Sequence, residues 1–171
     1  MRNLAYVASF LILAAPVLAQ NAASPQMDGM MKKAAPAAKS LAVKLDGKIK
    51  APVSLTLAQL KALPAVTVEV NYAEQGKSRW TGASLMAILD KAGTVEAKGG
   101  GAYLQHLILA RGNDGYAVGI AIGEIDPKFE GKQVIVAYER DGMALDSLHL
   151  IVPGDSHAGR GVRDLSEITV Q

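Results

Sequence analysis

The chain has no cysteine, and this absence limits both its stability and its chemistry. None of the 171 residues is a cysteine. Disulfides therefore contribute nothing to stability, and no thiolate is available to hold a soft or redox-active metal. A lipid anchor of the type attached to an N-terminal cysteine is excluded as well. The fold must depend on its apolar core, and hydrophobic residues make up 50% of the chain.

Blocks of basic residues are also absent, and aromatic residues are few. Lysine and arginine number 18 against 16 acidic residues, which gives a net charge of +2. The chain contains no run of lysine or arginine that could neutralise a phosphate backbone, so the sequence argues against a nucleic-acid partner. Aromatic residues account for 5% of the chain, and Trp80 is the only tryptophan.

One long apolar run is present, at the N-terminus. It extends from Leu4 to Ala19 behind the positively charged Arg2, and it contains Pro16. A membrane-spanning helix needs about 20 apolar residues, which is more than this run provides. The order of charged, apolar and small residues ahead of Gln20 is typical of a secretory signal. We therefore predict a signal peptide over residues 1–19 and a periplasmic or secreted mature protein without a stable membrane span.

Residues 20–40 are rich in alanine, proline, methionine and lysine and have neither a helical nor a strand period. This composition predicts a disordered tether. Within the tether, the run Met27-Asp28-Gly29-Met30-Met31 offers thioethers that suit Cu(I), the alternative being that these methionines have no metal role.

Residues 41–171 have the size and patterning of one α+β domain. Strands are predicted at Leu41–Leu45, Val53–Leu55, Ala65–Tyr72, Tyr103–Ala110, Tyr116–Ile120, Gln133–Tyr138, Leu148–Val152 and Ser166–Val170. Helices are predicted at Leu57–Leu63, Ala83–Ala92 and, as one turn, at Gly123–Lys128. The strands follow from alternating apolar residues, and the helices follow from caps and a 3.6-residue period. Between the third strand and the second helix, the polar residues 73–79 predict a loop.

Three motifs in this domain occur in a characteristic order. They are Arg79-Trp80-Thr81-Gly82 before a helix that ends at Gly93, Asn113-Asp114-Gly115-Tyr116 before the strand around Val134–Glu139, and Pro153-Gly154-Asp155 before Gly159-Arg160-Gly161-Val162-Arg163. Taken together, they resemble the oxidoreductase molybdopterin-binding domain of the sulfite-oxidase family over residues 41–171. The resemblance implies packed, mostly antiparallel or mixed sheets with short helices, and a loop-built pocket for molybdopterin.

The resemblance also implies roles for individual residues. Arg160 and Arg163 would hold the pterin phosphate, because arginine presents a planar fork of donors and Gly161 lets backbone amides approach; the alternative is that both are solvated. In the family a cysteine ligates molybdenum just after the strand that corresponds to Val66–Val70. Here that place holds Asn71-Tyr72, which argues against a thiolate-held molybdenum.

Four further side chains are candidates for the pocket or for the core. Trp80 and Tyr116 stand next to glycines, as pocket walls often do, and they equally suit core packing. His157 lies in a glycine-rich loop, where it either faces a ligand or only makes a loop hydrogen bond. His149 lies in a predicted strand and is interpreted as a satisfied sheet residue rather than a ligand.

The sequence leaves three functions open. The first is binding of a small ligand or a pterin-type cofactor in the family pocket by Arg160, Arg163, His157, Trp80, Gly161 and Tyr116. The second is a cofactor-free accessory module that binds a protein partner. The third is a molybdopterin-dependent oxidoreductase.

Overall fold

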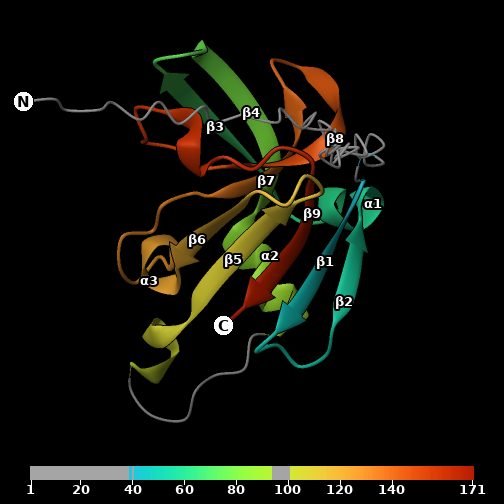
Figure 1. Cartoon of the computed structure of the whole chain (residues 1–171), viewed down its shortest axis with the longest axis vertical. Helices are drawn as coiled ribbons and strands as arrows, with labels where there is room; N and C mark the ends of the chain where they lie inside the picture. The colour runs from blue at the N-terminus through green and yellow to red at the C-terminus, as the bar shows by residue number, and fades with distance from the viewer. Residues whose placement is uncertain (1–38, 40, 94–100) are drawn as a thin grey trace, which may run out of the picture. The chain divides into compact units, whose positions relative to one another are not determined.

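The structure is a computed structural model that describes Lys39, residues 41–93 and residues 101–171 (Figure 1). These residues belong to one compact unit, Ala34–Gln171. The predicted signal peptide, nearly all of the predicted tether and the methionine run at residues 27–31 lie outside the described residues. Within the described part of the chain, no helix is both long enough and apolar enough to cross a membrane.

The described residues form two sheets and a few short helices. The five-stranded sheet has the order β2 (Val53–Thr56), β1 (Ala42–Gly47), β9 (Leu165–Val170), β5 (Leu107–Gly112) and β6 (Ala117–Ala121). The four-stranded sheet has the order β3 (Ala65–Tyr72), β4 (Gly76–Ser84), β7 (Ile135–Arg140) and β8 (Met143–Ile151). The helices are α1 (Leu57–Lys61), α2 (Leu85–Ala92) and α3 (Ile122–Ile125), with 3-10 turns η1 (Ala102–Gln105) and η2 (Ala158–Arg160).

Neighbouring strands are antiparallel except for β1 and β9, which are parallel. The predicted α+β class with mostly antiparallel, mixed sheets is therefore confirmed.

Local sequence signals explain the helix ends. The Thr56 side chain accepts a hydrogen bond from the Gln59 amide, and the Gln59 side chain accepts one from the Thr56 amide, so a capping box begins α1. The helix ends at Lys61, before Pro64 would interrupt it. Gly93 takes a left-handed conformation with φ of 66° and ends α2.

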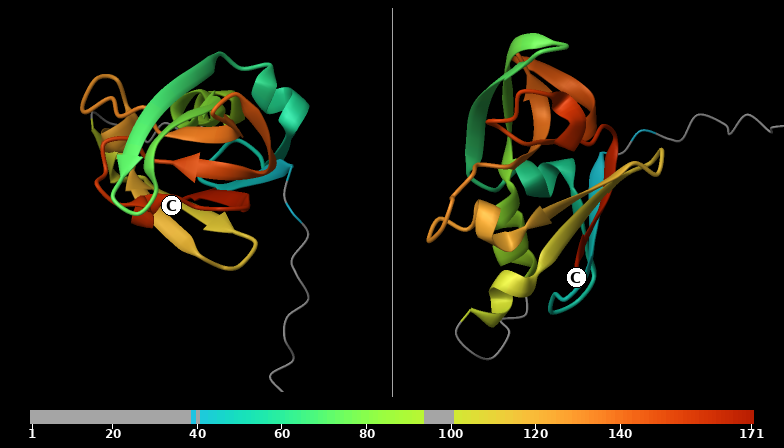
Figure 2. Two further views of the ribbon diagram at one scale, coloured as in Figure 1. Left: turned by 90° about the horizontal axis from the view of Figure 1, so that it is seen from above. Right: turned by 60° about the vertical axis from the view of Figure 1, so that its left-hand side comes forward.

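The main core draws side chains from both sheets and from α1 and α2. The α2 helix contributes Leu85, Ile88, Leu89 and Ala92, which recur at helical spacing and are buried. Figures 1 and 2 show α2 against the five-stranded sheet.

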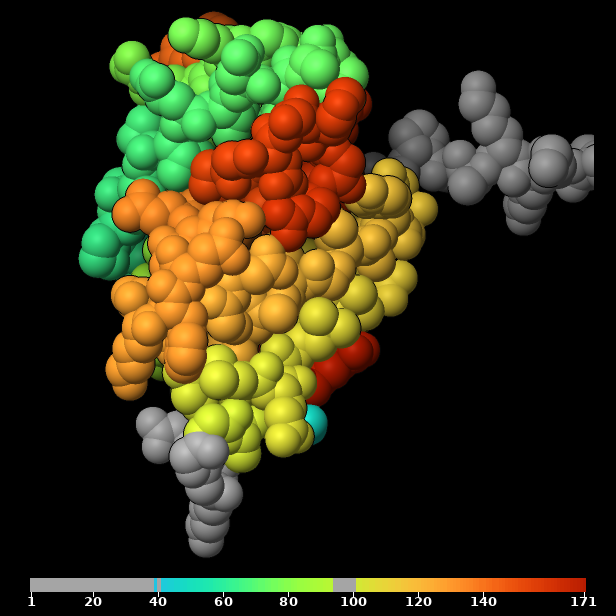
Figure 3. Space-filling view, turned by 90° about the vertical axis from the view of Figure 1, so that its left-hand side faces the viewer, coloured from blue at the N-terminus to red at the C-terminus, as the bar shows by residue number. Residues whose placement is uncertain are grey.

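A second, smaller core covers the other face of the four-stranded sheet. Its buried members are Val68, Val70, Tyr72, Trp80, Ile135, Ala137 and Ile151, and Ala158 packs against them. Residues 153–163, here called the C-terminal loop, supply that covering alanine. Figure 3 shows this loop, in red, between β3 in green and the α3 region in orange.

Several stretches differ from the sequence prediction, among them β8, which begins at Met143 rather than at Leu148. Two others, β4 and η1, differ in the type of element. Residues 76–84, predicted as a loop followed by the start of a helix, form β4, which pairs with β3 from Tyr72↔Gly76 to Ala65↔Ala83. The helix therefore begins at Leu85 rather than at Ala83. Residues 103–105, predicted as strand, belong to η1. The β4 strand pairs on one side with β3 through a short hairpin and on the other with β7, which is distant in sequence, and the local pattern does not report that second pairing.

Candidate functional site

The C-terminal loop carries four of the six predicted site residues. It begins after β8 with Gly154 at a φ of 86°, a left-handed turn that favours glycine. The Ser156 carbonyl accepts a hydrogen bond from the Ala73 amide at 2.9 Å. Val162 exchanges backbone hydrogen bonds with Leu150 of β8, at 2.8 and 3.1 Å. Both ends of the loop are thus fixed to the four-stranded sheet.

Arg160 is held by two carboxylates. Its guanidinium donates to both oxygens of Asp155, at 2.8 and 2.6 Å, and to Glu124 of α3 at 2.7 Å. These bonds, first to Asp155 and then to Glu124, raise the pKa of Arg160 above its ordinary value. The fork that the sequence assigned to a pterin phosphate therefore clamps the loop to α3 in this structure.

The pKa values of the two carboxylates, Asp155 and Glu124, shift in the opposite direction. The hydrogen bonds from Arg160 are the main cause that lowers the pKa of Asp155. Burial raises the pKa of Glu124, but the Arg160 hydrogen bond and other neighbouring groups outweigh burial, so the pKa is lowered overall. All three groups are therefore charged at neutral pH, and the clamp is a charge-assisted network.

Trp80 lies at the centre of the second core, with 4% of its surface exposed. Its indole N–H donates to the Ser78 hydroxyl at 2.9 Å. The ring centroid is 5.5 Å from that of His149, and the Arg140 guanidinium lies 4.9 Å from the indole centroid. The arrangement places a cation and an imidazole on the single tryptophan of the chain.

His149, predicted to be a sheet residue, lies in β8 beside Trp80. Burial lowers its pKa, and the charges of Arg163 and Arg140 lower it further, against the opposing effect of Asp164. Its Nε2 is 3.3 Å from the Ser147 hydroxyl. At neutral pH the imidazole is uncharged, so it can donate or accept a hydrogen bond as a ligand requires.

Trp80, His149 and Arg163 line one cavity of about 70 Å³. Its lining includes Tyr72, Gln75, Trp80, His149, Gly161 and Arg163. The structure thus brings together three of the predicted residues, Trp80, Gly161 and Arg163, and adds His149 and Gln75. No sequence motif connects these two additions to the others, because they reach the cavity from β8 and from the turn between β3 and β4.

His157 and Tyr116 do not line this cavity. His157 is exposed, and its Nδ1 pairs with the Glu74 carboxylate in the turn between β3 and β4. The Tyr116 hydroxyl donates to the Gly159 carbonyl, while 48% of the tyrosine surface is exposed. Both residues hold the C-terminal loop to its neighbours.

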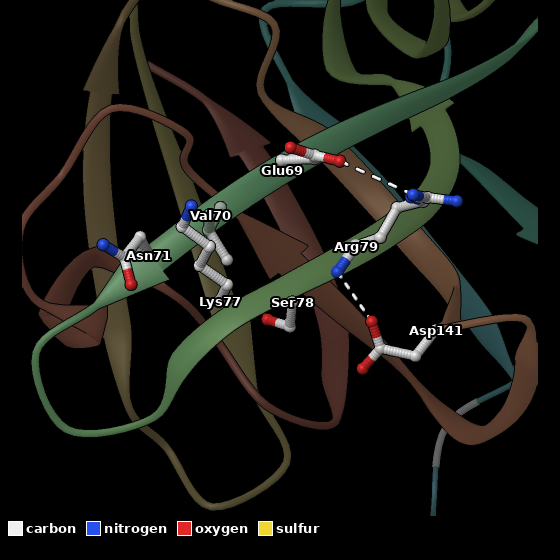
Figure 4. Close-up of a pocket in the computed structure, with 7 residues that line it drawn as sticks. All are labelled: Glu69, Val70, Asn71, Lys77, Ser78, Arg79 and Asp141. Carbon is white, nitrogen blue, oxygen red and sulfur yellow. Dashed lines mark hydrogen bonds and ion pairs between the residues drawn. The ribbon is translucent and has the colours of Figure 1, made fainter.

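Two larger hollows border β3. One of about 470 Å³ is lined by Glu69, Val70, Asn71, Lys77, Ser78, Arg79 and Asp141 (Figure 4). The other, of about 560 Å³, shares Glu69, Val70 and Asn71 and reaches Gly154, Asp155 and Ser156 of the C-terminal loop. Both hollows are wide enough for side chains of another molecule.

A thiolate-held molybdenum does not fit these residues, because the chain has no cysteine and Asn71-Tyr72 stand where the family has its thiolate. The cavity beside Arg163 is much smaller than the roughly 300 Å³ at which cofactor-sized sites begin. The 560 Å³ hollow beside Asn71 has the volume, but its charged lining residues are the carboxylates Glu69 and Asp155, which disfavour a phosphate. The 470 Å³ hollow has the volume as well, and Lys77 and Arg79 line it together with Glu69 and Asp141. Among the described residues, no cluster of three or more histidine, cysteine, aspartate or glutamate side chains is arranged to hold a metal ion.

Comparison with known proteins identifies the family of the fold. A family model described as the oxidoreductase molybdopterin binding domain matches residues 30–171. No match was found among curated proteins. Among solved structures, the sulfane dehydrogenase SoxCD from Paracoccus pantotrophus is similar, with a TM-score of 0.61 and 16% identity over 77% of this chain. The present chain spans 38% of that longer chain, and at this identity the likeness shows the fold alone.

Proposed function

The chain belongs to the oxidoreductase molybdopterin binding domain family, and we propose that it is an exported member that binds a small anion beside Trp80 and holds no molybdenum. The observation that carries the proposal is that Arg163 and His149 line one cavity with Trp80. A cation and a neutral imidazole in a partly buried cavity favour an anionic ligand with hydrogen-bonding oxygens.

The size of the cavity supports a compact ligand. About 70 Å³ is on the order of two water molecules in the liquid, which is close to the size of a simple oxyanion. The Gln75 amide adds both donors and an acceptor at the rim. The indole ring of Trp80 supplies a flat apolar wall.

The charge balance distinguishes Arg163 from Arg160. Asp155 and Glu124 neutralise Arg160. Arg163 is exposed, and its charge lowers the pKa of His149. We therefore assign ligand binding to Arg163 and loop attachment to Arg160.

Titration of Trp80 fluorescence with inorganic phosphate and with acetate tests the proposal. Because Trp80 is the only tryptophan, its emission reports this cavity directly. Saturable change is expected in the unaltered chain, and Arg163→Ala should weaken binding about tenfold, the loss of one charge-assisted hydrogen bond. Arg111→Ala, on the other sheet, is the matched control and should bind as before. Equal binding by both variants, or no saturable change with either anion, would contradict the assignment.

The Arg160→Ala substitution should act on stability instead. It leaves Asp155 and Glu124 without their shared partner, at a cost of about 1–3 kcal/mol in the free energy of unfolding. Urea unfolding followed by Trp80 emission measures this loss. A large loss of anion affinity in Arg160→Ala with unchanged stability would reverse the two assignments.

The oxidoreductase alternative has its own test. Protein purified from its native source should contain no stoichiometric molybdenum or pterin, because the chain has no thiolate for the metal and the cavity beside Arg163 is too small for the pterin. Elemental analysis and pterin fluorescence after denaturation measure both. About one molybdenum per chain would restore the enzyme hypothesis and refute the anion-binding proposal.

A further inference from the structure

The β3 strand forms one edge of the four-stranded sheet, and no other described strand pairs with its outer side. In an antiparallel pair, alternate residues direct their backbone groups toward the partner. The Ala73 amide bonds outward to Ser156, so the residues in step with it along β3, Asn71, Glu69 and Thr67, direct their backbone groups away from β4. They form a row of donors and acceptors on the open side.

The Ser156 contact shows how that row can be continued. A carbonyl of the C-terminal loop already occupies the position next to Ala73, where an added strand would begin. By contrast, the other long edge strand, β8, is partly covered because Leu150 pairs with Val162. Edge strands of this kind accept an extended peptide as an additional strand.

One of the two hollows lies beside the end of the open edge. Both border Glu69, Val70 and Asn71, but the 470 Å³ hollow extends over β4 toward Asp141, whereas the 560 Å³ hollow reaches Asp155 and Ser156 of the C-terminal loop. The 560 Å³ hollow therefore offers space for a side chain of an extended peptide beside Asn71.

The charge pattern on the outer face specifies one side chain of the occupant. Figure 4 shows Glu69 paired with Arg79, whose backbone amide donates to Asp141. Glu69 is the outermost residue of this row, and its side chain is 77% exposed. The side of Glu69 away from Arg79 therefore faces the position that an added strand would take. Opposite charges in directly facing positions stabilise a sheet, so that position suits lysine or arginine.

Neighbouring rows extend the pattern. The hydroxyls of Thr67 and Thr81 are 2.9 Å apart, and a further serine or threonine would continue that pair. Val66, Val68 and Val70 lie on the opposite face with the second core, so the alternate residues of the occupant should be apolar.

A second copy of this chain fits less well. The antiparallel register that uses all three outward residues of both copies centres on Glu69 and places the two Glu69 carboxylates opposite each other. Like charges in facing positions are unfavourable. A different chain with a basic residue at that position meets no such repulsion.

From this geometry we propose that β3 binds an extended segment of a partner protein by strand addition, with a lysine or arginine of that segment opposite Glu69. The segment alternates polar and apolar residues. This interaction is independent of the anion cavity, so either proposal can fail alone.

The test uses an acetylated peptide with the core Asn-Val-Lys-Val-Thr, which places its lysine opposite Glu69 in the antiparallel orientation. Binding to the purified chain is measured by fluorescence anisotropy of a labelled peptide, and the site by amide hydrogen exchange. Exchange at Thr67, Glu69 and Asn71 should slow at least about tenfold when the peptide is bound.

Two variants and two control peptides make the test specific. Glu69→Lys should weaken the lysine peptide about tenfold and favour a matched peptide with glutamate in place of the lysine. Glu69→Pro removes an outward amide without touching a bond to β4, and should weaken both peptides. A peptide N-methylated at its lysine should not bind, because it lacks the amide that faces β3.

Three outcomes would overturn the proposal. They are absence of binding at millimolar peptide, unchanged peptide preference in Glu69→Lys, and protection of Thr67 and Glu69 without peptide in a chain that sediments as a dimer. The last result would identify a second copy as the occupant.

Discussion

The three histidines of the chain lie in three different environments. His106 is buried, and its Nδ1 lies 3.1 Å from the Gln171 carbonyl. His149 packs against Trp80 with two arginines nearby, and His157 is exposed beside Glu74. His149 combines a lowered pKa with a place in the lining of a cavity, which is the combination expected of a functional side chain.

His149 should make the stability of the chain depend on pH. Its pKa is lower in the folded chain than the ordinary value of 6.5, mainly through burial. Below that pH the unfolded chain binds more protons, so stability falls as the pH decreases. His149→Gln should reduce this fall, measured as the difference in free energy of unfolding between about pH 7.5 and about pH 5.5 in urea.

The unaltered chain is the reference for this experiment. If His149→Gln and the unaltered chain lose the same free energy of unfolding on acidification, His149 is not the group responsible.

At the scale of elements, strand β4 depends on a glycine. The register between β4 and β7 shifts at Thr81 and Gly82, where β4 bends toward the start of α2. A Cβ at Gly82 would lie 2.2 Å from the Val136 carbonyl oxygen and 2.6 Å from the Ala137 Cα. These are backbone atoms of the adjacent strand, so they cannot move aside without disturbing the sheet.

Gly82→Ala should therefore lower the free energy of unfolding by about 2 kcal/mol or more, the usual effect of overpacking a core. Thermal or urea unfolding followed by circular dichroism measures the loss. Gly159→Ala is the control, because a Cβ there meets no atom within 4 Å. Comparable losses in the two variants would mean that the close approach of β4 and β7 is not what requires glycine.

At the scale of the whole molecule, the two sheets and the C-terminal loop separate stability from recognition. The main core joins both sheets, whereas the proposed anion cavity is lined by the loop and the proposed docking strand lies at an edge. Substitution of the exposed Arg163 in the cavity or of Glu69 at the edge should consequently alter binding with little effect on folding, whereas Trp80 and Tyr72 also belong to the second core.

The N-terminal apolar run predicts that the chain is exported and cleaved. We expect the exported protein to begin at Gln20, as intact-mass measurement of the periplasmic or secreted fraction would show. Leu11→Arg interrupts the run and should retain the uncleaved precursor in the cell. Ala38→Arg, which adds the same charge outside the run, should leave export unchanged. Cleavage at the same site in both variants would refute the signal-peptide prediction.

The sequence by itself determined the class of the fold and many of its elements. Alternating valines predict β3 with the bounds the structure has, Thr56 and Gly93 mark helix ends, and the ordered motifs identify the family. These features follow from local periodicity, capping and short-range backbone preferences, all of which can be read within a few residues.

Only the tertiary structure decided which residues share a site. It paired residues 76–84 with β3, brought His149 to Trp80, and bound Arg160 to Asp155 and Glu124. Trp80 and His149 are far apart in sequence, and the partners of Arg160 come from α3 as well as from its own loop. Strand pairing and charge neutralisation depend on contacts across the whole domain, so the local sequence carries no signal for them.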